Sequence, residues 1–155
     1  MSFDTNIFRI STNGLVVKDS DSLAFKLINP NGLYDPSLNG YSHIAVVQPN
    51  MKIIHISGQG GENNKGELSC NFDQQVQQVF YNIQTALNSV QAQLKDIAVL
   101  RVLIVNHNAE KLHLLTQTIQ HFWRNDSFPA CTLIPVPCLA LEGMQIEIEA
   151  TAYTV

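Results

Sequence analysis

Charged residues are scarce in this sequence. Of its 155 residues, 14% are Asp, Glu, Lys or Arg, against about 25% in a typical soluble domain. The formal net charge is −4 at pH 7, and no stretch is rich in lysine or arginine. Proteins dedicated to nucleic acids need such cationic side chains to contact phosphate. We therefore expect no nucleic-acid partner, and we expect another copy of the chain to cover part of this charge-poor surface.

Long apolar runs and paired cysteines are lacking too. No apolar stretch approaches the about 18 residues that cross a bilayer, and the first residues show no basic segment followed by an apolar one, as a signal peptide would. The three cysteines are Cys70, Cys131 and Cys138, and they form no CxxC motif. An odd, scattered set is typical of reduced thiols rather than of a disulfide framework. These features predict a cytoplasmic protein without a membrane partner.

Hydrophobic residues make up 45% of the chain, which is enough to give one domain of this length a sizeable core. Residues 41–47 and 53–57 read as two strands joined at Pro49–Asn50, so they predict an antiparallel hairpin. In such a hairpin His43 lies near His55. Two histidines can share a metal ion, but no third ligand stands at a recognisable spacing. We therefore favour satisfied or exposed histidines and expect no metal.

Two helices are predicted by apolar residues at helical spacing. The first follows Asn71 and the second follows Asn108, and either asparagine can cap its helix. Between them, residues 97–105 form an apolar run interrupted by Arg101, with the length and β-branched content of a central strand. The apolar stripes consist of Phe72, Val76, Val79, Phe80, Ile83, Leu87 and Val90 in the first helix, and of Leu112, Leu115, Ile119 and Phe122 in the second.

The N-terminal part is harder to interpret. Apolar residues in 7–10 and 15–17 flank the turn signal Asn13–Gly14, which predicts a short hairpin or an arm. Residues 29–40 are rich in proline and glycine and predict an ordered loop. The whole order is strand, strand, helix, strand, helix, strand, strand, and it places two helices on one face of a mixed sheet in an α+β fold. The other face lacks a helix, and its natural cover is another subunit.

The C-terminal strand shows strict alternation. Its apolar residues at even positions in 146–152 share one face, and Glu147 and Glu149 share the other. The carboxylates belong either to a solvated outer face or to a cleft, and alternation alone does not decide between them. The glycine-rich stretch 57–61 either forms an anion-binding nest or simply turns the chain. It is not a P-loop, because no Gly-Lys-Ser/Thr follows.

Five short motifs follow one another along the chain: Gly40-Tyr41-Ser42-His43, Ile56-Ser57-Gly58-Gln59, Gln75 with Asn82, Pro129-Ala130, and Ile146-Glu147-Ile148-Glu149-Ala150 with Ala152. Together they resemble the RidA/YjgF family, which is also called L-PSP endoribonuclease-like. The resemblance covers residues 28–155 and leaves residues 1–27 as an N-terminal extension. It implies a fold similar to bacterial chorismate mutase and a homotrimer with three ligand clefts between subunits. In RidA-type deaminases such a cleft hydrolyses 2-imino acids to 2-oxo acids and ammonia, without a metal or organic cofactor.

The resemblance also implies a set of site residues. Tyr41 matches the cleft tyrosine, Ser57 and Gly58 match the end of the second strand, and Glu147 matches the glutamate that positions the attacking water. Cys131 departs from the pattern, because the deaminases carry an arginine there that grips the substrate carboxylate. A thiol cannot replace a planar, permanently charged guanidinium. We therefore expect a poor 2-imino acid deaminase.

Cys131 and Arg101 each leave two interpretations open. Cys131 is either a small buried hydrophobe or a nucleophile whose pKa is lowered by a neighbour such as His43 or His55. Arg101 either supplies the missing positive charge of the cleft or reaches an edge or a subunit interface.

Three functions stay open, because a fold alone does not define an activity. The first is a cofactor-independent hydrolase of the enamine/imine deaminase type with an altered substrate. The second is a non-catalytic trimer with a metabolite-binding or regulatory role. The third is an endoribonuclease, which the acidic charge balance disfavours.

Overall fold

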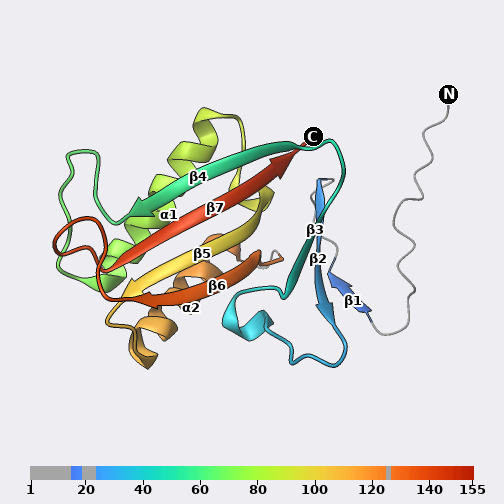
Figure 1. Cartoon of the computed structure of the whole chain (residues 1–155), viewed down its shortest axis with the longest axis horizontal. Helices are drawn as coiled ribbons and strands as arrows, with labels where there is room; N and C mark the ends of the chain where they lie inside the picture. The colour runs from blue at the N-terminus through green and yellow to red at the C-terminus, as the bar shows by residue number, and fades with distance from the viewer. Residues whose placement is uncertain (1–14, 19–23, 125–126) are drawn as a thin grey trace.

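The computed structural model describes residues 15–18, 24–124 and 127–155. Two long helices lie on one face of a four-stranded sheet, and a smaller three-stranded sheet lies at one end of it (Figure 1). The predicted α+β arrangement is confirmed. The strand expected in residues 7–10 lies outside the described residues.

The larger sheet is mixed. Its strand order is β4 (Lys52–Gly60), β7 (Ile146–Thr154), β5 (Ile97–Val105) and β6 (Ala130–Val136). The β5–β6 pair is parallel and the other pairs are antiparallel. Arg101 interrupts the apolar run of β5 without breaking the strand, because it points to the face that the helices leave open, beside Glu149 of β7.

The smaller sheet corrects the prediction of a hairpin between residues 41–47 and 53–57. Its strands are β1 (Leu15–Lys18), β2 (Phe25–Pro30) and β3 (Ile44–Val47), all antiparallel. β3 pairs with β2, whereas β4 pairs with β7, so the two segments enter different sheets. The physical reason is burial: Phe25 and Leu27 of β2 are 1% and 2% exposed and pack against Ala98 of the larger sheet. That strand had not been predicted.

The helices α1 (Phe72–Ser89) and α2 (Ala109–Trp123) begin after the predicted caps. The side chain of Asn108 accepts a hydrogen bond from the Lys111 amide at 2.9 Å, whereas the side chain of Asn71 makes no capping bond. The short 3₁₀ turns η1 (Ser37–Asn39) and η2 (Leu94–Asp96) complete the elements.

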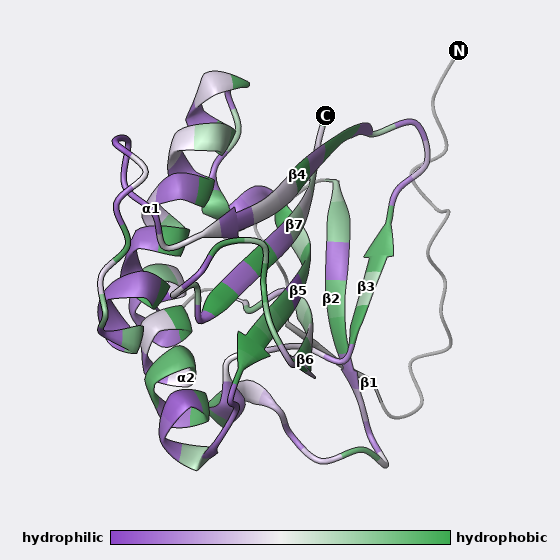
Figure 2. Cartoon of the chain, turned by 60° about the vertical axis from the view of Figure 1, so that its left-hand side comes forward, coloured by the Kyte–Doolittle hydropathy of each residue, from purple (hydrophilic) through white to green (hydrophobic). Residues whose placement is uncertain are grey.

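The core fills the space between the helices and the sheet. The stripe of α1 is buried as predicted except for Val90 just after its end, which is 39% exposed. In α2 the buried residues are Leu115, Ile119 and Trp123, which recur every four positions. Leu112 was expected in this stripe but is 45% exposed, and Trp123 was missed. The alternation along β7 is confirmed (Figure 2), with Ile146, Ile148, Ala150 and Ala152 all buried.

Two polar side chains of α1 fix the ends of β4 and β7. Gln75 is fully buried, donates to the carbonyls of Ser69 and Gly143, and accepts from the Gln145 amide at 2.9 Å. Asn82 donates to the carbonyls of Gly60 and Glu62. Buried polar groups are stable only when they are hydrogen-bonded. These two amides therefore fix the turn that precedes Glu147 and the end of β4 that lies opposite it.

Candidate functional site

A cavity of about 400 Å³ lies on the helix side of β6, between α2 and the loop that precedes β3. Cys131 and Leu133 project into it from β6, because they alternate with the residues on the open face of the sheet. Apolar side chains dominate the walls, and among the described residues that line it there is no lysine or arginine. The full lining is Tyr34, Asn39, Gly40, Tyr41, Leu112, Leu115, Thr116, Ile119, Cys131, Thr132 and Leu133.

The thiol of Cys131 is half-buried and packs against the core. Burial raises its pKa to about 12, because the thiolate would lose its hydration. A thiol with this pKa is protonated at neutral pH, and the thiolate is the nucleophilic form. This favours the interpretation of Cys131 as a small hydrophobe over that of a nucleophile.

Two aromatic residues of the cavity lining, Tyr34 and Tyr41, form a cluster with the ring of His43. The hydroxyls of Tyr34 and Tyr41 share a hydrogen bond. The ring of His43 meets both tyrosines edge to face, with centroids 5.3 Å from Tyr34 and 5.5 Å from Tyr41. The Nε2 atom of His43 also lies 2.9 Å from the carbonyl oxygen of Tyr34. The predicted residue Tyr41 is thus part of a cluster that includes a tyrosine from the preceding loop.

Glu147 and Gly58 lie together elsewhere, on the open face of the sheet. Glu147 of β7 is opposite Gly60 of β4, and the register shifts between Ile56 and Gln59, at Ser57 and Gly58. A Cβ atom on Gly58 would overlap the Glu147 carboxylate, so the glycine is what lets this side chain lie across the strand. Ser57 beside it is exposed.

The predicted site residues therefore form two groups in one chain. Tyr41 and Cys131 line the cavity on the helix side, whereas Ser57, Gly58 and Glu147 lie on the open side, with β5 between β7 and β6. Alternate residues of a strand point to opposite faces. The structure thus brings together the members of each group, but it does not bring the two groups together within one subunit.

Arg101 does not reach the cavity. Its Nη1 atom lies 2.9 Å from Oε2 of Glu149, and both side chains are exposed on the open face of this subunit. This ion pair engages the carboxylate of Glu149, which had been considered as a second cleft carboxylate beside Glu147. Arg101 therefore belongs to the open face of the sheet, and the cavity beside Cys131 receives no charge from it within the same subunit.

The two histidines that had been considered for a metal site have separate partners. His43 contacts Tyr34, and Nδ1 of His55 lies 3.3 Å from the Thr151 hydroxyl in the larger sheet. In the part of the chain that the structure describes, no cluster of three or more His, Cys, Asp or Glu residues has the arrangement of a metal site.

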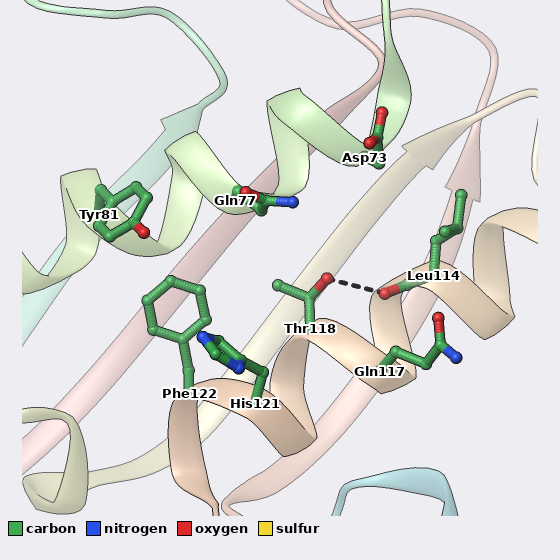
Figure 3. A pocket seen from close by; sticks show the side chains of 8 residues that line it. All are labelled: Asp73, Gln77, Tyr81, Leu114, Gln117, Thr118, His121 and Phe122. Atoms are coloured by element: carbon green, nitrogen blue, oxygen red, sulfur yellow. Dashed lines mark hydrogen bonds between the residues drawn. The ribbon is translucent and has the colours of Figure 1, made fainter.

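A second cavity of about 390 Å³ lies between α1 and α2 on the outer side of the helix layer (Figure 3). Tyr81 and Gln77 line it from α1, and His121 and Phe122 line it from α2. It contains none of the predicted site residues. We therefore take the cavity beside β6, not this groove, as the candidate site.

Comparisons with known proteins point to the same family as the motifs do. The model of the family described as Endoribonuclease L-PSP matches residues 34–154. The crystal structure of YyfB from Yersinia pestis, a Rid-family protein of unknown function, has a TM-score of 0.80 and 33% identity, covering 84% of this chain and 99% of that one. The chain belongs to the RidA/YjgF family.

Two further RidA/YjgF structures are more distant. RidA from an Antarctic Psychrobacter has a TM-score of 0.60 and 26% identity, and covers 65% of this chain and 80% of its own. The YjgF gene product from E. coli has a TM-score of 0.60 and 26% identity, and covers 69% of this chain and 84% of its own. A search of curated proteins gave no match. No helix of the described residues is long and apolar enough to cross a membrane.

Sequence reasoning missed most of the cavity lining in this RidA/YjgF protein, and two of the missed residues show why. Tyr34 lies in a loop, where no periodicity indicates which side chains converge. Leu112 had been placed in the core stripe of α2, but it lines the cavity at the helix edge instead. A tyrosine that is 60% exposed, close to a second tyrosine, is a signal that only the structure provides.

Proposed function

We propose that this protein binds a small, uncharged metabolite in a cleft between the subunits of a homotrimer. The cavity beside Cys131 forms one wall of the cleft, and Glu147 and Gly58 of a neighbouring copy form the other. The observation that carries the proposal is the thiol of Cys131, whose pKa burial raises to about 12 so that it stays protonated. By the motif resemblance, this position corresponds to the arginine of RidA-type deaminases. Neither positive charge nor thiolate is then available at this position.

The character of the cavity supports the uncharged ligand. Small-molecule sites are typically about 300–1,000 Å³, mostly apolar, and carry a few polar groups that orient the ligand. The cavity of about 400 Å³ has walls of leucine and isoleucine and polar groups from Tyr34, Tyr41 and Thr116. A carboxylate placed here would lose hydration without a cation to compensate, which is costly. An uncharged carbonyl compound avoids that cost.

The separation of the site residues supports a cleft between subunits. Glu147 and Cys131 lie on opposite faces of the sheet in one chain, so a single subunit cannot direct both at one ligand. A neighbouring copy that turns its own open face toward the β6 edge of this chain would bring its Glu147 to the Cys131 wall. The resemblance to RidA-type trimers likewise implies that each ligand cleft lies between two subunits.

The proposed chemistry is hydrolysis without a cofactor, with Glu147 as the group that holds and activates water. Proton transfer to a placed carboxylate typically contributes about 10²–10⁴ in rate. Without the arginine grip, 2-imino acids should be poor substrates. The test is a coupled assay that generates the imine in place and follows its hydrolysis. Turnover by the wild-type protein equal to that of an arginine-bearing RidA would contradict the proposal.

A binding titration addresses the ligand independently of turnover, and so also covers a protein that binds without catalysis. The matched probes are 2-oxobutanoate and 2-oxobutanamide, which differ in charge and hardly in shape. Nuclear magnetic resonance titration of the wild-type protein should show tighter binding of the amide. Binding of the anion alone, or of neither probe, would overturn the proposal. An endoribonuclease function has no comparable support, since the described lining of the cavity contains no cation for phosphate.

A further inference from the structure

We infer that Tyr34 is a second ligand-recognition residue of this site, and that its hydroxyl and that of Tyr41 together bind one uncharged oxygen acceptor, the carbonyl of a ketone or amide. The inference rests on the proposed function, because it specifies which ligand group the cavity beside Cys131 recognises. Tyr34 is not among the residues that the family resemblance assigned.

The two hydroxyls form a hydrogen-bonded pair in which either oxygen can be the donor. They share a hydrogen bond, and both tyrosines line the cavity. Each tyrosine hydroxyl carries one proton and accepts as well. One proton is used between the two oxygens, so the second proton remains for a group in the cavity. A hydroxyl that accepts one bond becomes a better donor in the next, because bonds in a chain polarise one another. The pair therefore suits one uncharged acceptor.

His43 holds Tyr34 in position. A carbonyl oxygen only accepts, so the contact of 2.9 Å between His43 Nε2 and the Tyr34 carbonyl assigns the proton to Nε2. The backbone amide of His43 donates to Oδ1 of Asn29 in β2 at 2.9 Å. His43 is thus a positioning residue: it joins the loop that carries Tyr34 to the smaller sheet, and its ring contacts both tyrosines.

The walls define the rest of the ligand. Leu112, Ile119 and Leu133 present apolar surface beside the hydroxyl pair. A compact molecule with an alkyl body and one carbonyl satisfies both surfaces, and its carbonyl takes the remaining hydroxyl proton. A carboxylate would bring a full negative charge to the one remaining neutral donor, which does not neutralise it. The recognised class is therefore uncharged carbonyl compounds of a few carbon atoms.

The test is the affinity for 2-oxobutanamide of wild type, Tyr34→Phe and the control Tyr81→Phe. The phenylalanine ring of the first variant would keep the packing, and only the hydroxyl would be removed. Because one neutral hydrogen bond is lost, the Kd should rise about 3- to 10-fold. Tyr81 is an exposed tyrosine on α1 outside this cavity, so its variant should bind as wild type does. Equal affinity in Tyr34→Phe would overturn the inference and leave the proposed function standing. Absence of amide binding in the wild type would overturn both.

Two further measurements separate recognition from folding. In the wild type with labelled tyrosine rings, the amide should shift the Tyr34 and Tyr41 resonances and leave those of Tyr81 in place. His43→Gln retains an N–H donor for the Tyr34 carbonyl and should keep affinity, whereas His43→Phe should weaken it. An unshifted Tyr34 resonance would contradict the inference without any variant.

Discussion

At the scale of single residues, the proposal depends on position 131, where the charge of the side chain would determine which ligand charge the site accepts. Burial raises the pKa of the Cys131 thiol to about 12, so at pH 8 only about one molecule in 10⁴ carries the thiolate. An ordinary thiol at this pH is roughly one-quarter ionised, given a pKa near 8.5. Cys131 thus brings no negative charge to the cavity.

This predicts slow alkylation of Cys131. At pH 8 iodoacetamide should modify it about a thousand-fold more slowly than an ordinary thiol, in proportion to the thiolate fraction. The rate should keep rising as the pH is raised toward 12. Peptide mapping by mass spectrometry gives the rate for each cysteine, with the exposed Cys70 and Cys138 as internal comparisons. Modification of Cys131 as fast as that of Cys138 at pH 8 would show that the thiol is not shielded.

Gly58 and Glu147 form a second coupled pair at this scale. Gly58→Ala adds a methyl group where the Glu147 carboxylate lies, so the carboxylate must move or the strands must separate. We expect a loss of about 1–3 kcal/mol in the free energy of unfolding. Glu147→Ala removes the obstacle, so Gly58→Ala should cost much less in that background. Additive losses in a denaturation cycle of the four proteins would refute the contact.

At the scale of elements, the two helix starts differ although both have asparagine at the cap. The Asn108 side chain accepts from the Lys111 amide at 2.9 Å, whereas Asn71 makes no side-chain cap bond. Asn108→Ala should therefore cost about 1 kcal/mol. Asn71→Ala is its matched control and should cost less than half of that. Urea denaturation measures both, and equal losses would mean that the bond at Asn108 contributes nothing.

Elements with a local periodic signal could be predicted from the sequence. The stripe of α1 and the alternation of β7 follow directly from spacing, and they place Glu147 on the correct face. Pairing between strands could not be predicted in the same way. Residues 25–30 carry only a few apolar positions, and their pairing with β3 depends on burial against Ala98, which is distant in the sequence. Tyr34 was missed for a similar reason, because convergence of loop side chains is not encoded in a period.

At the scale of the whole molecule, the open face of the larger sheet is the main unexplained surface. Val99 and Ile134 on this face are 39% and 37% exposed, and the Arg101–Glu149 pair lies near them. In a monomer this pair would contribute at most about 1 kcal/mol. If a neighbouring copy covers the face, removal of one partner leaves a buried unpaired charge and costs about 3–5 kcal/mol.

Arg101→Met should therefore destabilise the protein strongly and shift the oligomer toward monomer. Lys95→Met is the control, with the same change of charge at an exposed position in η2. Light scattering should give the wild type a mass about three times that of the 17.2 kDa chain. A wild-type monomer, or equal effects of the two variants, would contradict the covered face.

The central claim is that residue 131 sets the charge of the ligand. The most direct measurement is the ratio of the Kd values for 2-oxobutanoate and 2-oxobutanamide, in the wild type and in Cys131→Arg. The wild type should prefer the amide. Arginine restores a charge-assisted bond to carboxylate, worth about 1.5–3 kcal/mol, so the ratio should shift toward the anion by about 10- to 100-fold. A wild type that prefers the anion, or a ratio that Cys131→Arg leaves unchanged, would contradict the account.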